Sequence, residues 1–211
     1  LGRAVTNGCS EMATALVNGI ITLMFNWTML KYVGEDGVAA ITIISYVLAF
    51  AGSLYAGYAY GVAPMLSFYY GEQNHEKLRK LVRTSLKIIG VIAAATVLVS
   101  LAVTEPLVSI FARPGTPVYD LAVAGNRICS LALLFVGFNI FASGMFTALS
   151  NGLISAVLAF SRTFVFTLIA MLVLPVILGV TGIWLATPAA ELAAVVLSAV
   201  MLLKYRRRYC Y

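Results

Sequence analysis

Long apolar stretches alternate with short polar segments along the whole chain. Each stretch reaches about 20 residues, the length that an α-helix needs to cross the hydrocarbon core of a bilayer. The short breaks between the stretches are rich in Gly, Pro and Asn, which end helices and form turns. The pattern therefore predicts an all-α transmembrane protein, a bundle of six helices with spans at about 4–31, 38–69, 86–103, 121–149, 153–178 and 183–203.

The segment 71–87 differs from the stretches on either side of it. Apolar positions recur there at helical spacing, while Lys77, Arg79, Lys80 and Arg83 surround the opposite face. This arrangement is typical of an amphipathic helix that lies along a membrane surface. We therefore expect 71–87 to be a cytoplasmic amphipathic linker that turns into the third span.

Composition supports a membrane protein and excludes most other classes. The chain is 62% apolar and 10% charged, whereas soluble proteins have about 25% charged residues. The net charge of +6 is concentrated at span ends, so anionic lipid headgroups are expected partners and nucleic acid is not. Cys9, Cys129 and Cys210 lie far apart, which suggests neither a metal site nor a disulfide framework.

The distribution of basic residues predicts the orientation of the chain. With 71–87 inside the cell, ten Lys and Arg lie on the inner side, against three on the outer side: Lys31, Arg113 and Arg127. Such a bias is typical of the cytoplasmic face. We expect a multi-pass protein of the cell membrane with both ends of this chain in the cytoplasm. The chain begins at Leu1 without a methionine, so we also expect it to be part of a longer protein.

Three ionisable residues inside the spans are candidates for function, because each costs at least about 2.5–3.5 kcal/mol to insert. Glu11 could exchange a proton or sodium ion within a cavity, or it could be an interfacial glutamate in an over-long helix. Glu191 could take part in ion coupling, lie at the outer interface, or pair with Arg127. Arg162 lies near mid-span and is expected to tie helices together through backbone carbonyls.

Neutral polar and aromatic residues suggest a cavity. Asn18, Asn26, Asn139, Tyr55 and Met24 are candidates to line it, with Arg162. The asparagines could instead be hydrogen-bond links between helices, and aromatic residues in spans often pack or face lipid. Aromatic rings and methionines would suit flat organic cations. The sequence contains no recognisable enzyme motif and no metal-ligand cluster, so we expect no enzymatic activity, metal or cofactor.

Several short motifs, taken in order, resemble the second half of transporters of the multidrug and toxic compound extrusion (MATE) family. The resemblance covers the whole chain. It is carried by Gly34-Glu-Asp-Gly-Val-Ala-Ala40, Gly61-Val-Ala-Pro64, Tyr70-Gly-Glu-Gln-Asn-His-Glu-Lys-Leu-Arg79, Glu105-Pro-Leu-Val-Ser-Ile-Phe111, Phe146-Thr-Ala-Leu-Ser-Asn-Gly152 and Gly182-Ile-Trp-Leu-Ala186.

The resemblance implies a twelve-helix fold with two six-helix lobes, of which residues 1–211 would form the C-terminal lobe. It implies proton- or sodium-coupled export of cationic organic drugs or toxins, with the N-terminal lobe absent from this chain. Glu11 falls where the family often carries a cation-site acid in its seventh helix. Asn139 falls where sodium-coupled members often carry an aspartate, so a sodium site in this lobe is in doubt.

Three other functions compete with this one. A lipid-linked oligosaccharide flippase of the same superfamily would need several cavity cations for a pyrophosphate, and only Arg162 and Arg127 could serve. A free-standing six-span protein could dimerise as a channel or scaffold. An intramembrane enzyme would need a nucleophile and a base, for which the sequence offers no set.

Replacing Glu11 by Gln in the intact transporter tests the expected coupling role. Glutamine keeps the size of the side chain but cannot exchange a proton or balance a cation, so coupled efflux should be abolished or strongly weakened. Drug resistance of cells at normal expression is the measurement. Unchanged resistance would contradict the assignment of Glu11.

Overall fold

The computed structural model describes residues 2–209 and 211, with side chains from Leu16 onward except that of Cys210. Every regular element in this part of the chain is helical. The elements are α1 Gly2–Tyr32, α2 Glu35–Gly71, α3 His75–Ala102, α4 Thr104–Phe111, α5 Pro117–Cys129, η1 Ser130–Ala132, α6 Leu133–Ala148, α7 Gly152–Phe160, η2 Ser161–Phe166, α8 Thr167–Leu178 and α9 Val180–Tyr209.

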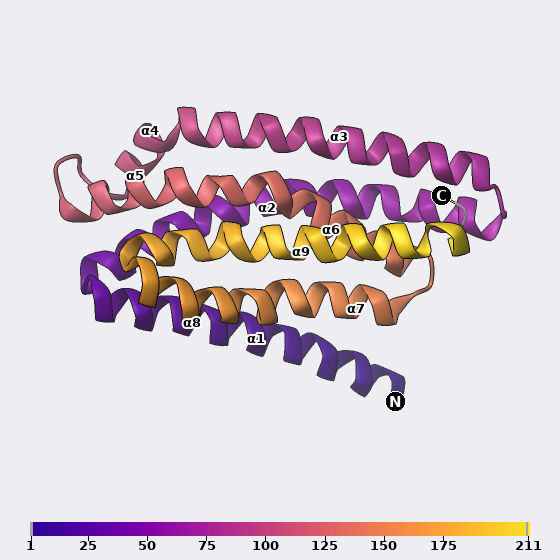
Figure 1. Cartoon of the computed structure of the whole chain (residues 1–211), viewed down its shortest axis with the longest axis horizontal. Helices are drawn as coiled ribbons and strands as arrows, with labels where there is room; N and C mark the ends of the chain where they lie inside the picture. The colour runs from indigo at the N-terminus through magenta and orange to yellow at the C-terminus, as the bar shows by residue number, and fades with distance from the viewer. Residues whose placement is uncertain (1, 210) are drawn as a thin grey trace.

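The elements form six long antiparallel rods, since α5, η1 and α6 follow one another without a loop, as do α7, η2 and α8 (Figure 1). Helix α1 begins and helix α9 ends at the same end of the bundle. Within the described residues, five rods are long and apolar enough to cross a membrane: α2, α3, 117–148, 152–178 and α9. This architecture confirms the predicted all-helical bundle.

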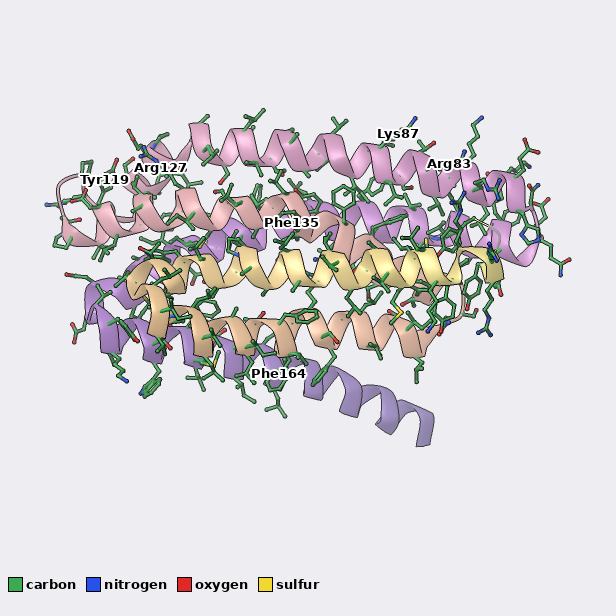
Figure 2. The ribbon with its side chains drawn as sticks, in the orientation of Figure 1. Arg83, Lys87, Tyr119, Arg127, Phe135 and Phe164 are labelled. Atoms are coloured by element: carbon green, nitrogen blue, oxygen red, sulfur yellow. The ribbon has the colours of Figure 1, made fainter. Side chains whose placement is uncertain are left out.

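Charged side chains gather at the two ends of the bundle. Figure 2 shows Arg83 and Lys87 toward the end where α2 joins α3, and Arg127 at the opposite end. The basic residues near the end of α9 also lie at the first of these ends. Most of the length between the ends is apolar, as expected for rods that span a bilayer.

The segment 71–87 does not form a helix of its own, as the sequence led us to expect, but is mostly the first part of a longer one. A single helix, α3, runs without a break from His75 to Ala102, and the Asn74 side chain caps it by accepting a hydrogen bond from the Lys77 N–H at 3.1 Å. The physical reason is that one buried stripe continues through both segments: Leu78, Val82, Ser85, Ile89, Ala93, Val97 and Ser100. This face packs on other helices rather than on lipid.

The fourth rod begins earlier than the predicted residue 121. Pro117 occupies the first turn of α5, where a missing N–H costs nothing, and the Thr116 side chain caps the helix. The preceding loop contains the short helix α4. Proline therefore starts the rod here rather than marking the loop before it.

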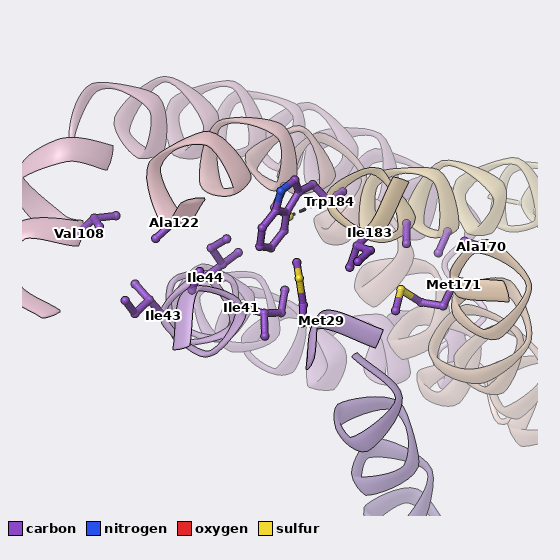
Figure 3. Close-up of a cluster of buried hydrophobic side chains, with 14 residues drawn as sticks. Met29, Ile41, Ile43, Ile44, Val108, Ala122, Ala170, Met171, Ile183 and Trp184 are labelled. Atoms are coloured by element: carbon purple, nitrogen blue, oxygen red, sulfur yellow. Dashed lines mark hydrogen bonds between the residues drawn. The ribbon is translucent and has the colours of Figure 1, made fainter. Parts of the chain in front are cut away.

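Three groups of buried side chains hold the rods together. One group surrounds Trp184 of α9, which lies with Ile44 of α2, Met29 of α1 and Ala122 of α5 (Figure 3). The backbone carbonyl of Trp184 also accepts a hydrogen bond from the Cys129 thiol at 3.3 Å. A second group centres on Phe146 and Leu78, and a third on Tyr55 and Leu133.

Close approach of helices depends on Gly137 in α6. A Cβ atom there would lie 2.5 Å from Cδ1 of Tyr55 and 2.9 Å from Cγ2 of Ile89. Tyr55 cannot easily move, because its hydroxyl bonds both Thr96 and the Leu133 carbonyl. By contrast, a Cβ on Gly57 or Gly61 would meet no atom within 4 Å, so this pair makes no close helix contact within the described part of the chain.

Alanine substitutions at two glycines test this packing. Gly137→Ala should destabilise the bundle by about 1–3 kcal/mol because it overpacks the contact with Tyr55. Gly61→Ala, the control, should be neutral or stabilising by up to about 1 kcal/mol, since alanine is the better helix former. Unfolding in mild detergent by SDS titration is the measurement. Equal effects of the two substitutions would contradict the packing described.

Candidate functional site

A network of polar side chains lies where α6, η2 and α9 meet. It consists of Asn139 from α6, Arg162 from η2, and Glu191 and Ser198 from α9, and we call these four residues the polar network. Glu191 and Ser198 are seven residues apart, so both lie on one face of α9. Asn139, Glu191 and Ser198 are all buried. These groups lie along the middle parts of their rods, away from the rod ends.

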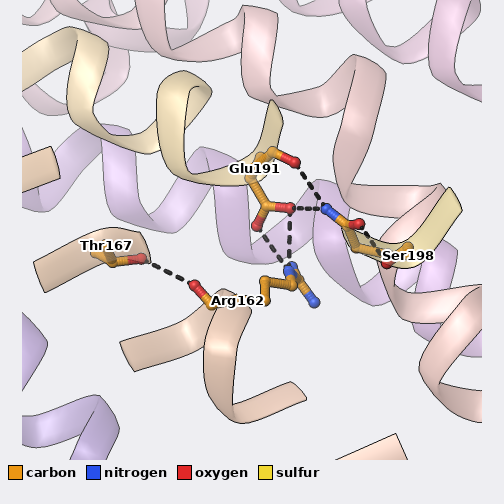
Figure 4. A network of polar contacts seen from close by, with 5 residues as sticks. Arg162, Thr167, Glu191 and Ser198 are labelled. Carbon is orange, nitrogen blue, oxygen red and sulfur yellow. Dashed lines mark hydrogen bonds and ion pairs between the residues drawn. The ribbon is translucent and has the colours of Figure 1, made fainter. Parts of the chain in front are cut away.

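The carboxylate of Glu191 is the centre of the polar network (Figure 4). Arg162 Nε donates to its Oε1 at 2.8 Å and to its Oε2 at 3.0 Å. Asn139 Nδ2 donates to Oε2 at 2.7 Å and to the backbone carbonyl of Glu191 at 3.0 Å. Ser198 Oγ in turn donates to Asn139 Oδ1 at 3.0 Å. Both carboxylate oxygens are therefore partnered.

Arg162 reaches this position from a π-helical turn. Residues Ser161–Phe166 form the π-helix η2, and the Thr167 hydroxyl donates to the Arg162 carbonyl, five residues earlier, at 3.1 Å. A π-turn holds one residue more than an α-turn, so it shifts the face that the following helix presents. Such turns cost stability and occur frequently at functional sites.

Burial makes the ion pair of Arg162 and Glu191 sensitive to any loss of a partner. Their side chains are 24% and 11% exposed. Taking two charges out of water is costly, and only close pairing with further hydrogen bonds offsets that cost. A proton or cation that binds Glu191 must therefore compete with Arg162, and each such event changes the contacts among three rods.

The structure shows how Arg127 and Arg162 are paired. Arg127 pairs with Glu105 at 2.8 Å, and both are more than half exposed, so the pairing of Glu191 with Arg127 was wrong. Arg162 does link helices, but through the carboxylate of Glu191 rather than through the carbonyls that we expected. The Glu11 side chain lies outside the described residues, so its role stays a prediction.

The other residues predicted to line a cavity do not come together around one. Tyr55 is fully buried and binds Thr96 at 2.5 Å and the Leu133 carbonyl at 2.9 Å, so it ties three helices rather than lining a cavity. Asn18 is exposed on α1, whereas Met24 is half-buried and packs against the core around Trp184. Asn26 lines a groove of about 770 Å³ between α1 and α2.

The sequence analysis did not predict two sets of hydroxyl groups that bind the buried asparagines. Ser198 completes the polar network, and its spacing of seven from Glu191 was the available signal. Asn126 of α5 is buried and donates to Thr104 at 2.9 Å, while Ser100 and Ser130 share a hydrogen bond of 2.7 Å. The spacing of Ser100 and Thr104, one helical turn, was the signal for this second cluster. Within the described residues no three His, Cys, Asp or Glu side chains gather to hold a metal.

Comparisons with known proteins give one consistent result. The family profile described as MatE matches residues 12–173. No curated protein matched the sequence. An outward-facing multidrug resistance MATE family transporter of the MOP superfamily is similar in structure, with a TM-score of 0.82 and 22% identity over 92% of this chain and 43% of its own.

Two further solved structures are similar. An inward-facing multidrug resistance MATE family transporter matches with a TM-score of 0.82 and 23% identity, over 92% of this chain and 44% of its own. The Vibrio cholerae MATE transporter VcmN, solved as a mutant, matches with a TM-score of 0.84 and 18% identity, over 93% and 44%. The chain thus spans less than half the length of the structures it resembles.

Removing one partner of the buried pair should be far more damaging than removing one partner of the exposed pair. Glu191→Ala leaves the Arg162 guanidinium buried without a counter-charge, at a cost of about 3–5 kcal/mol. Glu105→Ala breaks an exposed pair and should cost about 1 kcal/mol or less. Free energies of unfolding in mild detergent measure both. A loss no larger for Glu191→Ala than for Glu105→Ala would show that the polar network does not stabilise the bundle.

Proposed function

Because this chain belongs to the MatE family, we propose that it forms the C-terminal lobe of a cation-coupled antiporter that exports organic cations such as drugs or toxins. The family profile covers most of the chain, and the solved MATE transporters share its fold. Each of those structures has a further half that this chain lacks, which supports an N-terminal six-helix lobe as its partner.

The carboxylate of Glu191 is the observation on which the coupling proposal rests. It holds α9 to both α6 and η2 through Asn139 and Arg162. Neutralising it by a proton removes the attraction to Arg162 and leaves that guanidinium to find another partner. The two charge states of Glu191 thus favour different arrangements of the same rods, and a difference in proton affinity between two states is what couples a proton to a conformational change.

The surroundings of Glu191 favour a proton over sodium as the coupling ion at this residue. A sodium ion at the carboxylate would lie close to the Arg162 guanidinium, which is 2.8 Å from Oε1, and like charges at such distances repel strongly in a buried site. Asn139 supplies only a neutral amide. Glu11 remains a second candidate for coupling.

The groove between α1 and α2 supports organic cations as the substrate class. Trp27 and Tyr46 present aromatic rings there, beside the carboxylate-bearing Glu35. The Lys31 ammonium lies 5.6 Å from the centre of the Trp27 ring, so a cationic substrate would have to displace it from that ring. A flat cation could take a similar place over the aromatic rings.

Equal likeness to two transport states supports a lobe that moves as one body. The chain matches an outward-facing and an inward-facing transporter with the same TM-score of 0.82. A lobe that was remodelled during transport would be expected to fit one of them better. We therefore propose that transport depends on rocking of this lobe against its missing partner within the cell membrane, with both ends of this chain in the cytoplasm.

The flippase alternative is less well supported. Arg162 and Arg127, the cations expected to hold a pyrophosphate, each contact a carboxylate, those of Glu191 and Glu105. Paired guanidinium groups offer less charge to a phosphate ligand. No observation favours the free-standing homodimer.

Gradient-driven transport by the intact protein in proteoliposomes tests the coupling proposal. Glu191→Gln should lose accumulation of an organic dye cation driven by a proton gradient, while dye exchange without a gradient persists. Glu105→Gln, the control, should behave as the unchanged protein. A Glu191→Gln protein that folds, as judged by size-exclusion chromatography, and still accumulates the dye would contradict the role of Glu191. Accumulation driven by a sodium gradient alone would contradict the choice of ion.

A further inference from the structure

A small groove lies where the end of α2 meets the start of α3. Its volume is about 350 Å³, and it is lined by Met65, Tyr69, Lys77, Lys80, Leu81 and Thr84. We call it the lysine groove. It combines two ammonium groups, two hydroxyl-bearing side chains and two apolar side chains at the basic end of the bundle.

The order of side chains along α3 continues this arrangement. Lys77, Lys80, Thr84 and Lys87 are three or four residues apart, so they follow one face of the helix. Farther from the basic end, the same face carries the exposed apolar side chains Ile88, Val91 and Leu98. Figure 2 shows the Lys87 side chain pointing away from the bundle. On this face, the lysines lie near the basic end of the bundle and the exposed apolar side chains lie farther along the helix. A phospholipid has the same order, with its charged headgroup followed by its acyl chains.

The charges of the lysine groove are not neutralised by the protein. Neither Lys77 nor Lys80 forms a salt bridge with a carboxylate among the described residues, whose ion pairs involve Arg127 and Arg162. The Lys77 ammonium lies 5.6 Å from the centre of the Tyr69 ring, which holds it over the groove. Glu72 and Glu76 come earlier in the chain, at the turn and in the first turn of α3.

We propose that the lysine groove binds one anionic phospholipid, with its phosphate at Lys77 and Lys80 and an acyl chain along Ile88, Val91 and Leu98. The Thr84 hydroxyl is placed to donate to a phosphate or glycerol oxygen. Charge complementarity argues for an anionic lipid over a zwitterionic one, because two uncompensated ammonium groups gain little from a neutral headgroup. The apolar face of α3 argues for a lipid over a free phosphate.

The proposal does not depend on the transport activity or on which side of the membrane this end lies. Its consequence is a lipid bound across the junction of α2 and α3, where it contacts the turn between the second and third rods. Such a lipid would stabilise that junction in proportion to its occupancy, because a ligand that binds only the folded state shifts unfolding.

Native mass spectrometry of the intact protein tests the proposal directly. The probes are phosphatidylglycerol and phosphatidylcholine with the same acyl chains, added to protein in a neutral detergent. Phosphatidylglycerol should bind more tightly, and Lys77→Gln/Lys80→Gln should weaken its binding about 25-fold, or about fivefold for each lysine near a membrane surface. Arg206→Gln/Arg208→Gln changes the net charge equally at the exposed end of α9, away from the lysine groove, so it should leave the binding almost unchanged.

Three outcomes would overturn the proposal. Equal binding of the two lipids would show that charge does not select the ligand. Equal loss in the lysine and arginine variants would show that phosphatidylglycerol responds only to net charge. Full competition by glycerol phosphate, which carries the headgroup phosphate without acyl chains, would indicate a site for a free anion. The substituted residues are exposed, and circular dichroism of both variants should match that of the unchanged protein.

Discussion

A charged pair in the middle of an apolar bundle constrains everything around it. Arg162 and Glu191 are largely buried, so losing either partner would leave the other charge poorly compensated. Asn139 and Ser198 complete the set, and the π-turn of η2 carries the arginine. The same contacts that hold three rods in place are thus the ones that a proton would change. In the proposed mechanism, stability and proton coupling depend on the same carboxylate, that of Glu191.

Elsewhere in the bundle, neutral polar side chains also bind groups on neighbouring helices. Tyr55 places its hydroxyl between α3 and the start of α6, and Asn126 donates a hydrogen bond to the hydroxyl of Thr104, just after α3. Because the bilayer supplies no hydrogen-bond partners, a polar side chain within a span binds another helix or costs stability. These links are spread over several rods, so they tie the rods to one another and resist bending within the bundle.

The helical bundle was predictable because the chain contains repeated stretches of about 20 apolar residues, the length that a helix needs to cross a bilayer. Span ends and turns followed from Gly, Asn and Pro, although Pro117 starts a rod that was expected to begin at residue 121. The sequence interpretation separated 71–87 from the third span because of its charged residues, whereas one buried apolar stripe continues from Leu78 to Ser100 in a single helix. Sequence reasoning found Glu191, Arg162 and Asn139 individually. It could not pair them, because their contacts join residues 29 to 52 positions apart, and a π-turn sets the direction of Arg162.

The most direct test separates the two roles of the ion pair by replacing both partners with apolar side chains. Arg162→Met/Glu191→Met removes both charges, and such replacement of a buried pair is often neutral or stabilising. If Glu191 couples a proton to transport, the double variant folds like the unchanged protein but does not accumulate an organic dye cation against its gradient in proteoliposomes. Gradient-driven accumulation at the unchanged rate would show that the pair is structural alone and would contradict the central claim.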